Sequence, residues 1–202
     1  MLETDKYYHI YNRGNNHEII FREEKNYDYF LKRYNFYLSD YLKTLAYCLM
    51  PNHFHFVIKI RKVHNEETFE ISDTSNVLYN NPRKLSDIEK AFKNFFISYS
   101  KSMNEAYNRT GSLFQAKYKK KEITSKEYLA QVIQYIHLNP VKSGLCNSCE
   151  EWKHSSYNAF TINNPIGIER NEVIELFDSR DNFIYCHNSK FTDKNIQDDF
   201  NF

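Results

Sequence analysis

The feature that most constrains the fold is the run LMPNHFHFVI at residues 49–58. Its turn signal at Pro51 is followed by aromatic and β-branched residues, a composition typical of a buried strand. Successive side chains of a strand point to opposite faces of the sheet, so His53 and His55 share one face. Two imidazoles at this spacing can bind one divalent metal ion, because neutral imidazole is the commonest metal ligand in proteins. Two half-buried histidines at a sheet edge are the alternative interpretation.

The rest of the chain alternates strand-like and helix-like patterns. Apolar residues at helical spacing predict amphipathic helices, and β-rich runs bounded by turn signals predict strands. We expect strands over 6–11, 42–50, 53–60 and 114–123. We expect helices over 23–41 and 86–108, with Ser86 as the N-cap of the second helix. A turn is expected at 12–16 and a polar surface loop over 61–82. The order strand-helix-strand-strand-helix-strand predicts an α+β, ferredoxin-like antiparallel sheet with helices on one side.

One more helix is expected after these elements, capped by Thr124 or Ser125 and ending near residue 140. At about 100° per residue, Tyr135 falls off the apolar face of this helix and lies one turn from Asn139. The two side chains are therefore adjacent in space, either as part of a site or as a local hydrogen-bonded pair. His137 projects from a different side, so we do not assign it as a ligand.

Charge is distributed unevenly although the net charge is only +1. Residues 83–126 contain 11 Lys and Arg against 4 Asp and Glu, whereas residues 161–202 contain 4 against 8. A basic middle with an acidic tail suggests a polyanion as partner for the middle, and a solvated helix face is the alternative.

Composition argues for a protein of the cytoplasm without membrane association. No apolar run is long enough to span a bilayer, and the polar, acidic N-terminal segment is unlike a signal peptide. The 4 cysteines suit a reducing compartment, and the single CxxC at residues 146–149 reads as two ordinary thiols rather than a zinc site. At 202 residues the chain suits one domain with a small appendage.

Several motifs in a fixed order together resemble the single-tyrosine HUH transposases, and most closely the REP-associated tyrosine transposases. The matching motifs are Asn12-Arg13-Gly14, Met50-Pro51-Asn52, His53-Phe54-His55, Gly111-Ser112-Leu113-Phe114-Gln115, Gln134-Tyr135-Ile136-His137-Leu138-Asn139-Pro140-Val141 and Trp152-Lys153-His154-Ser155-Ser156-Tyr157. The likeness covers roughly residues 6–160. It implies a catalytic domain over 1–145, which includes the added helix, and a C-terminal extension over 146–202.

The resemblance also implies the roles of the site residues. His53 and His55 would be metal ligands, Asn139 a third ligand, and Tyr135 the nucleophile. The family implies Mg²⁺ or Mn²⁺, while two imidazoles and an amide would equally suit Zn²⁺ or Ni²⁺. No P-loop motif occurs, so we expect no nucleotide cofactor.

The reaction implied is the nicking and joining of single-stranded DNA beside a hairpin through a covalent 5′-phosphotyrosine. Lys117, Lys119, Lys120 and Lys121 are expected to neutralise phosphates, with Lys117, Lys119 and Lys121 on one strand face, and Asn12 and Arg13 are further candidate DNA contacts. A strand kept soluble by its lysines is the alternative for this run.

Two other functions are compatible with the same residues. A non-cleaving DNA-binding protein of the same fold is the main alternative function, and a metal-dependent hydrolase is a third hypothesis. We expect a monomer.

Overall fold

The computed structural model describes residues 1–62, 87–161 and 168–189. One four-stranded antiparallel sheet has the order β2-β3-β1-β4. Its strands are β1 (Tyr7–Arg13), β2 (Leu42–Met50), β3 (His53–Ile60) and β4 (Lys119–Ile123). The helices are α1 (Glu24–Leu38), α2 (Asp87–Ala106), α3 (Lys126–Lys142), α4 (Tyr157–Thr161), α5 (Arg170–Leu176) and α6 (Arg180–Asn188), with short 3-10 turns at Asn15–His17 and Cys149–Glu151.

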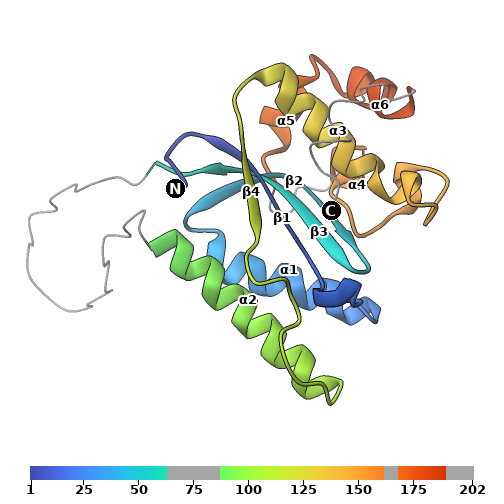
Figure 1. Cartoon of the computed structure of the whole chain (residues 1–202). Coiled ribbons are helices and arrows are strands. Elements are labelled where there is room, and N and C mark those ends of the chain that lie inside the picture. The colour runs from blue at the N-terminus through green and yellow to red at the C-terminus, as the bar shows by residue number, and fades with distance from the viewer. Residues whose placement is uncertain (63–86, 162–167, 190–202) are drawn as a thin grey trace, which may run out of the picture.

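This order and pairing confirm the predicted ferredoxin-like fold. β1 and β2 flank β3, and α1 and α2 cover the same face of the sheet (Figure 1). α3 and the C-terminal helices cover the opposite face, so the described chain forms three layers with the sheet in the middle. None of the described helices is long and apolar enough to cross a membrane.

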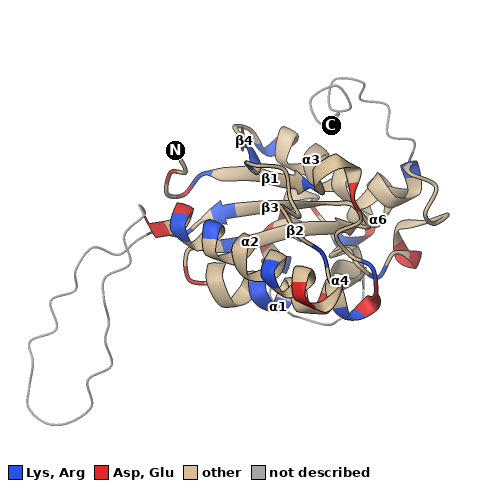
Figure 2. Cartoon of the chain, turned by 60° about the horizontal axis from the view of Figure 1, so that its bottom comes forward, with Lys and Arg blue, Asp and Glu red and all other residues tan. Residues whose placement is uncertain are grey.

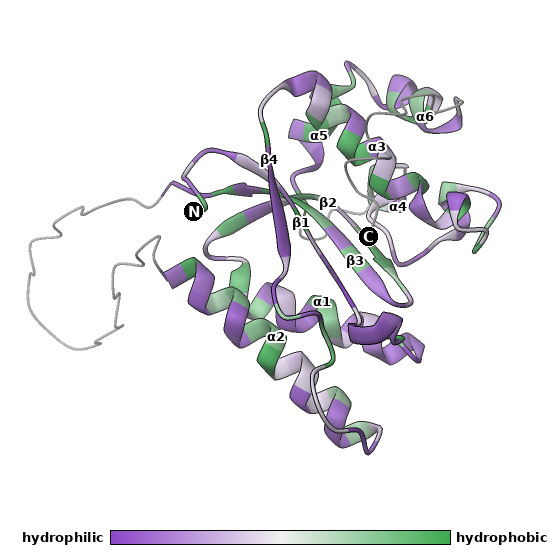
Figure 3. Cartoon of the chain, in the orientation of Figure 1, coloured by the Kyte–Doolittle hydropathy of each residue, from purple (hydrophilic) through white to green (hydrophobic). Residues whose placement is uncertain are grey.

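Two apolar clusters hold the layers together, one on each face of the sheet. Alternation decides the division: Phe54 and Phe56 of β3 join the cluster beneath α1 and α2, whereas Val57 joins the cluster beneath α3. β2 and β4 are the two edge strands of the sheet, but β2 is mostly buried whereas β4 is hydrophilic along most of its length, a contrast visible in Figure 3. Lys and Arg occur along α1, α2 and β4, with Asp and Glu interspersed on the helices (Figure 2).

Element boundaries differ from the sequence prediction mainly around β1 and β4. β1 continues beyond the expected turn to Arg13, because Arg13 pairs with His53 across the sheet. The expected strand over 114–123 is regular only from Lys119 onward, and before it a single bridge joins Gly14 to Phe114. A Cβ at Gly14 would lie 2.0 Å from the Glu18 carbonyl oxygen, so the chain needs glycine at this close approach.

The helix predictions hold with shifted ends. α1 stops at Leu38 rather than Tyr41, and α3 passes through Pro140 to Lys142, with the Ser143 N–H donating to Asn139 O at its end. Ser86 and most of the expected loop over 61–82 lie outside the described residues.

The described part of the C-terminal extension packs on α3 and β2 through a buried polar chain. His187 Nδ1 lies 2.7 Å from the carbonyl oxygen of Phe183, which can only accept, so Nδ1 carries the proton. His187 Nε2 therefore accepts from His137 Nδ1–H (3.0 Å), and His137 Nε2 accepts from the Ser156 hydroxyl (2.8 Å). Ser156 Oγ in turn accepts from the Tyr47 N–H of β2 (2.9 Å). Every donor along this chain has an acceptor only while both imidazoles are neutral.

Burial lowers the pKa of both histidines, to about 4 for His187 and well below its usual value for His137. A group with a lowered folded-state pKa stabilises the fold above its unfolded pKa of about 6.5, and the stabilisation is lost as the pH falls through that range. We therefore expect the free energy of unfolding to fall between about pH 6.5 and 4, by on the order of 3 kcal/mol for His187 alone.

Denaturant titrations at a series of pH values measure this loss. The variant His187→Leu should be less stable at neutral pH, because His137 Nδ1–H loses its acceptor, and its stability should depend less steeply on pH. A variant of the exposed His17, His17→Leu, serves as the control. If the free energy of unfolding of His187→Leu fell with pH as steeply as that of the unaltered protein, the pH dependence would come from the other buried histidines.

Candidate active site on the sheet face beneath α3

His53 and His55 project from β3 toward α3. Their ring centroids are 5.1 Å apart, with the ring planes nearly perpendicular at 88°. Across the sheet, His53 pairs with Arg13 and His55 with Tyr11, so these β1 side chains share the same face. Both rings are therefore inside the layer between the sheet and the helix rather than at a free sheet edge.

Hydrogen bonds on both sides of His55 link its ring to β1 and to α3. Asn139 Nδ2 of α3 lies 3.1 Å from His55 Nε2, and His9 Nε2 of β1 lies 2.9 Å from His55 Nδ1. The Ser143 hydroxyl donates to Asn139 Oδ1 (3.5 Å), which favours the amide orientation with Nδ2 toward His55. His55 then accepts at Nε2 and donates from Nδ1 to His9. The lone pair of Nε2 faces α3, and this is the tautomer that a metal ligand needs.

His53 has the same tautomer for an independent reason. Its Nδ1 lies 2.7 Å from Asn52 Oδ1, an acceptor, so the proton is on Nδ1 and the lone pair on Nε2. Burial, and then the nearby charge of Arg13, lower the pKa of His53 to about 4, partly offset by hydrogen bonding to Asn139. Burial also lowers the pKa of His55 well below its usual value, with smaller effects from His9 and His53. Both imidazoles are neutral at physiological pH.

Tyr135 lies one turn before Asn139 on α3 and packs edge-on against His55, with ring centroids 6.2 Å apart. Its side chain is only 9% exposed, and burial raises the pKa of its hydroxyl, with a further contribution from Tyr11. The ammonium of Lys142, two turns along the same helix, lies 5.0 Å from the centre of the Tyr135 ring. Burial lowers the pKa of Lys142.

The structure separates two neighbours that the sequence analysis grouped. Arg13 lies on the face of the histidines and contacts His17. Asn12 points to the opposite face, where it is 3% exposed and its amide donates to the Gln115 carbonyl (3.3 Å). Asn12 therefore supports the segment before β4 rather than the histidine site.

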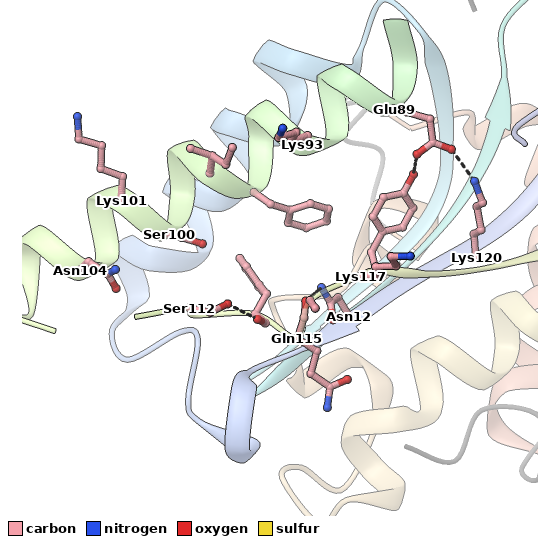
Figure 4. Close-up of a pocket in the computed structure, with 15 residues that line it drawn as sticks. Asn12, Glu89, Lys93, Ser100, Lys101, Asn104, Ser112, Gln115, Lys117 and Lys120 are labelled. Carbon is pink, nitrogen blue, oxygen red and sulfur yellow. Dashed lines mark hydrogen bonds and ion pairs between the residues drawn. The ribbon is translucent and has the colours of Figure 1, made fainter. Parts of the chain in front are cut away.

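The basic run is likewise divided between the two faces. Lys119 and Lys121 pair with Tyr11 and His9 of β1, so both lie on the histidine face, and the Lys119 ammonium is 5.7 Å from the Tyr11 ring centre. The prediction that Lys117 shares their face was wrong, because residues 114–118 are not part of the regular strand. Lys117 lines a pocket on the other face together with Lys120 (Figure 4).

Sequence reasoning missed three residues of this site: His9, Tyr11 and Lys142. His9 and Tyr11 alternate along β1 and stack on each other at 4.6 Å, so period-2 spacing alone could have placed them on one face. Nothing in the sequence indicates that this face of β1 meets His55. Lys142 is three residues after Asn139 and could have been found by helical spacing, had the helix not been expected to end near Pro140.

Among the described residues, no group of three or more His, Cys, Asp and Glu side chains is arranged to hold a metal ion. A metal at this place would therefore depend on the two imidazoles and the Asn139 amide.

Comparison with known proteins gives one curated relative. The chain is 24% identical over 115 residues to a putative REP-associated tyrosine transposase of Haemophilus influenzae, a match that covers 57% of this chain and 58% of the relative. The match thus spans less than two thirds of the relative's length. No family model matches the sequence.

Among solved structures, a REP-associated tyrosine transposase bound to a REP hairpin matches with a TM-score of 0.56 and 14% identity, over 83% of this chain and 87% of that one. A bacterial tRNA(His) guanylyltransferase-like protein in complex with GTP matches with a TM-score of only 0.37 and 8% identity, over 71% and 69% of the two chains. The first of these shares the fold, and together with the curated relative it confirms the resemblance that the motifs indicated.

The hydrogen-bond chain through His55 predicts a specific protonation pattern. At neutral pH, ¹⁵N spectra of the imidazoles should show both His9 and His55 protonated at Nδ1. The variant His9→Leu leaves the buried Nδ1–H of His55 without this acceptor, which should lower the free energy of unfolding by about 1–3 kcal/mol. The control is His17→Leu, which removes an exposed imidazole instead of a buried one. A His55 ring protonated at Nε2 in the unaltered protein would contradict the arrangement.

Proposed function

We propose that this protein nicks and rejoins single-stranded DNA at hairpin-flanked sites through a covalent 5′-phosphotyrosine formed on Tyr135. The observation that carries the proposal is the convergence of Tyr135 and Asn139 of α3 on His55 of β3. Tyr135 and the Asn139 amide thus face neutral imidazoles across the interface between the sheet and α3. The same arrangement is what a metal-assisted nucleophilic attack on phosphate requires.

The donor set fits a divalent metal ion. His53 and His55 both present an Nε2 lone pair, because Asn52 and His9 accept their Nδ1 protons. Asn139 reaches both rings, but only its amide oxygen can bind a cation, so ligation requires the amide orientation opposite to the one that donates to His55. Bound there, Mg²⁺ or Mn²⁺ would act as a Lewis acid toward a phosphate oxygen.

The surroundings of Tyr135 explain why it needs assistance. Burial makes its hydroxyl less acidic than a free tyrosine, so ionisation is not favoured before DNA binds. The Lys142 ammonium 5.0 Å from the ring is placed to favour negative charge developing on the phenolic oxygen. Arg13 beside His53 adds a second cation on the same face, suited to a phosphate.

In the proposed step the phenolic oxygen of Tyr135 attacks the scissile phosphorus. The bond from phosphorus to the 3′ oxygen breaks, and that oxygen leaves with the electron pair. It takes up, through solvent, the proton that the Tyr135 hydroxyl loses, which gives a free 3′-hydroxyl. The phosphate stays joined to the 5′ carbon and to Tyr135. Attack by another 3′-hydroxyl reverses the step and rejoins DNA, so no nucleotide cofactor is required.

The partner is supported by the comparisons. The relative with this fold was solved with a REP hairpin, and the curated relative is named as a transposase of the same kind. In this chain, Lys119 and Lys121 of the edge strand lie on the face of Tyr135, where they would contact phosphates of DNA entering the site. The expectations of a monomer and of a cytoplasmic location stay predictions.

The proposal predicts that Tyr135→Phe abolishes the covalent adduct while DNA binding and stability change little, because only one hydroxyl is removed. The substrate is a pool of single-stranded DNA with randomised flanks on either side of a hairpin, and the adduct is detected as a mass shift that survives denaturation. Tyr128→Phe, on the same helix, is the matched control. No adduct from the unaltered protein, with DNA binding intact, would favour the non-cleaving DNA-binding protein.

A second prediction concerns the metal. Changing His53 or His55 to Ala should remove binding of one Mn²⁺ per chain, followed by calorimetry or electron paramagnetic resonance without DNA, and should abolish metal-dependent cleavage. His154→Ala, a change of a half-buried histidine outside the site, should retain both. Undiminished Mn²⁺ binding in both site variants would place the ion elsewhere.

A further inference from the structure

A pocket of about 930 Å³ lies on the sheet side opposite the histidine site, between α2 and the segment that leads into β4 (Figure 4). The α2 wall includes Glu89, Lys93, Ile97 and Lys101, which are four residues apart and therefore lie on one face of the helix. The facing wall is formed by residues 112, 114–118 and 120, and Asn12 of β1 closes one end. The volume is at the upper end of the range of about 300–1,000 Å³ that is usual for ligand sites.

The pocket is basic. Lys93 and Lys101 border it on α2, and Lys117 borders it on the facing segment. In the described part of the chain, no ion pair is formed by these three lysines. Lys120 differs, because it pairs with Glu89, and the same carboxylate also accepts from the Tyr118 hydroxyl. The one acidic group of the lining is thus already neutralised.

Aromatic rings and uncharged polar groups complete the lining. Phe96 and Tyr118 are half-buried, with ring centroids 5.7 Å apart. The ring of Phe114 packs edge-on against that of Phe96, with centroids 5.3 Å apart. Asn104 and Gln115 supply amides that can donate and accept hydrogen bonds. Rings beside unneutralised lysines and amides are the combination that binds single-stranded nucleic acid, through stacking of bases and contacts to the backbone.

We propose that this pocket binds nucleotides of a single-stranded DNA segment that flanks the cleaved site, with bases against Phe96 and Tyr118 and phosphates on Lys93, Lys101 and Lys117. This inference rests on the proposed function, because it assigns a second binding subsite to the same DNA. A single strand is the occupant, since bases in a duplex are stacked on one another and not available to side chains.

The position of the pocket connects it to the reacting groups. β4 is an edge strand, and β1, which supplies Asn12 to the pocket, pairs directly with β3. The Gln115 N–H, at the pocket end nearest Asn12, donates to the carbonyl of Arg13 (3.0 Å), which itself lies beside His53. Lys119 and Lys120 point to opposite faces of β4, so cations line both sides of the edge. A strand of DNA passing around β4 would meet basic groups throughout.

The first test compares the double variant Lys93→Gln/Lys101→Gln with the control Lys32→Gln/Lys90→Gln. The control removes the same charge from exposed positions on α1 and α2 that do not line the pocket. The probe is a fluorescent 12-nucleotide oligothymidylate. The pocket variant should bind it more weakly, and its slope of log affinity against log salt should be flatter by about 1.4, which is about 0.7 for each phosphate that is no longer neutralised. Equal slopes in the pocket and control variants would overturn the proposal.

The second test locates the bases. Oligothymidylate carrying 5-iodouracil is cross-linked by light to the Tyr135→Phe variant, so that no covalent intermediate interferes, and the modified peptides are identified by mass spectrometry. Cross-links to Phe96 or Tyr118 are expected. Cross-links confined to tyrosines of the histidine face, such as Tyr11 or Tyr128, would overturn the proposal.

These outcomes are separable from the failure of the proposed function. Absence of the covalent adduct in the unaltered protein would refute nicking without affecting binding in the pocket. In contrast, normal adduct formation together with a pocket variant that binds DNA like its control would refute the pocket alone.

Discussion

The hydrogen-bonded position of His55 between two other elements is the interaction on which the site depends. His9 of β1 accepts from one ring nitrogen, and Asn139 of α3 donates to the other. These contacts join the sheet to the helix above it, orient the ring, and leave the Nε2 lone pair directed toward the helix. They exist only because β1 pairs with β3 in the register that sets Tyr11 opposite His55. A slip of one residue would turn every one of these side chains to the other face.

The sheet gives the protein two chemically different faces. Beneath α3, neutral imidazoles and Tyr135 form a compact and largely buried cluster suited to bond breaking, with the exposed Lys142 beside the tyrosine ring. Beneath α2, an open pocket of lysines and rings is suited to holding a flexible polyanion. Because side chains alternate along a strand, neighbouring residues of β1 contribute to both faces. Arg13 faces the histidine site and Asn12 faces the pocket. The edge position of β4 makes the route between the two faces short.

Sequence reasoning located the strands, the helices and the order of the fold, because hydrophobic periodicity reports which face of an element is buried. It placed His53 and His55 together and Tyr135 beside Asn139, since these relations are local and follow from strand and helix geometry. It failed for Lys117, where alternation was extended through residues 114–118. These residues meet the end of β1 through the Gly14–Phe114 bridge and the contacts of Gln115, but they form no regular strand. It also placed Asn12 and Arg13 in a turn, because their pairing partners are forty residues away in the chain.

The sequence by itself determined the residue types, their local spacing and the order of elements, all of which depend on contacts within a few residues. Only the tertiary structure decided that α3 lies over the histidine face, that His9 and Lys142 join the site, and that the basic run is divided between two surfaces. These depend on strand register and on which sheet face each helix covers. Both are set by the burial of apolar clusters whose members lie far apart in the sequence. The buried hydrogen-bond chain through His137 additionally holds the C-terminal helices against α3.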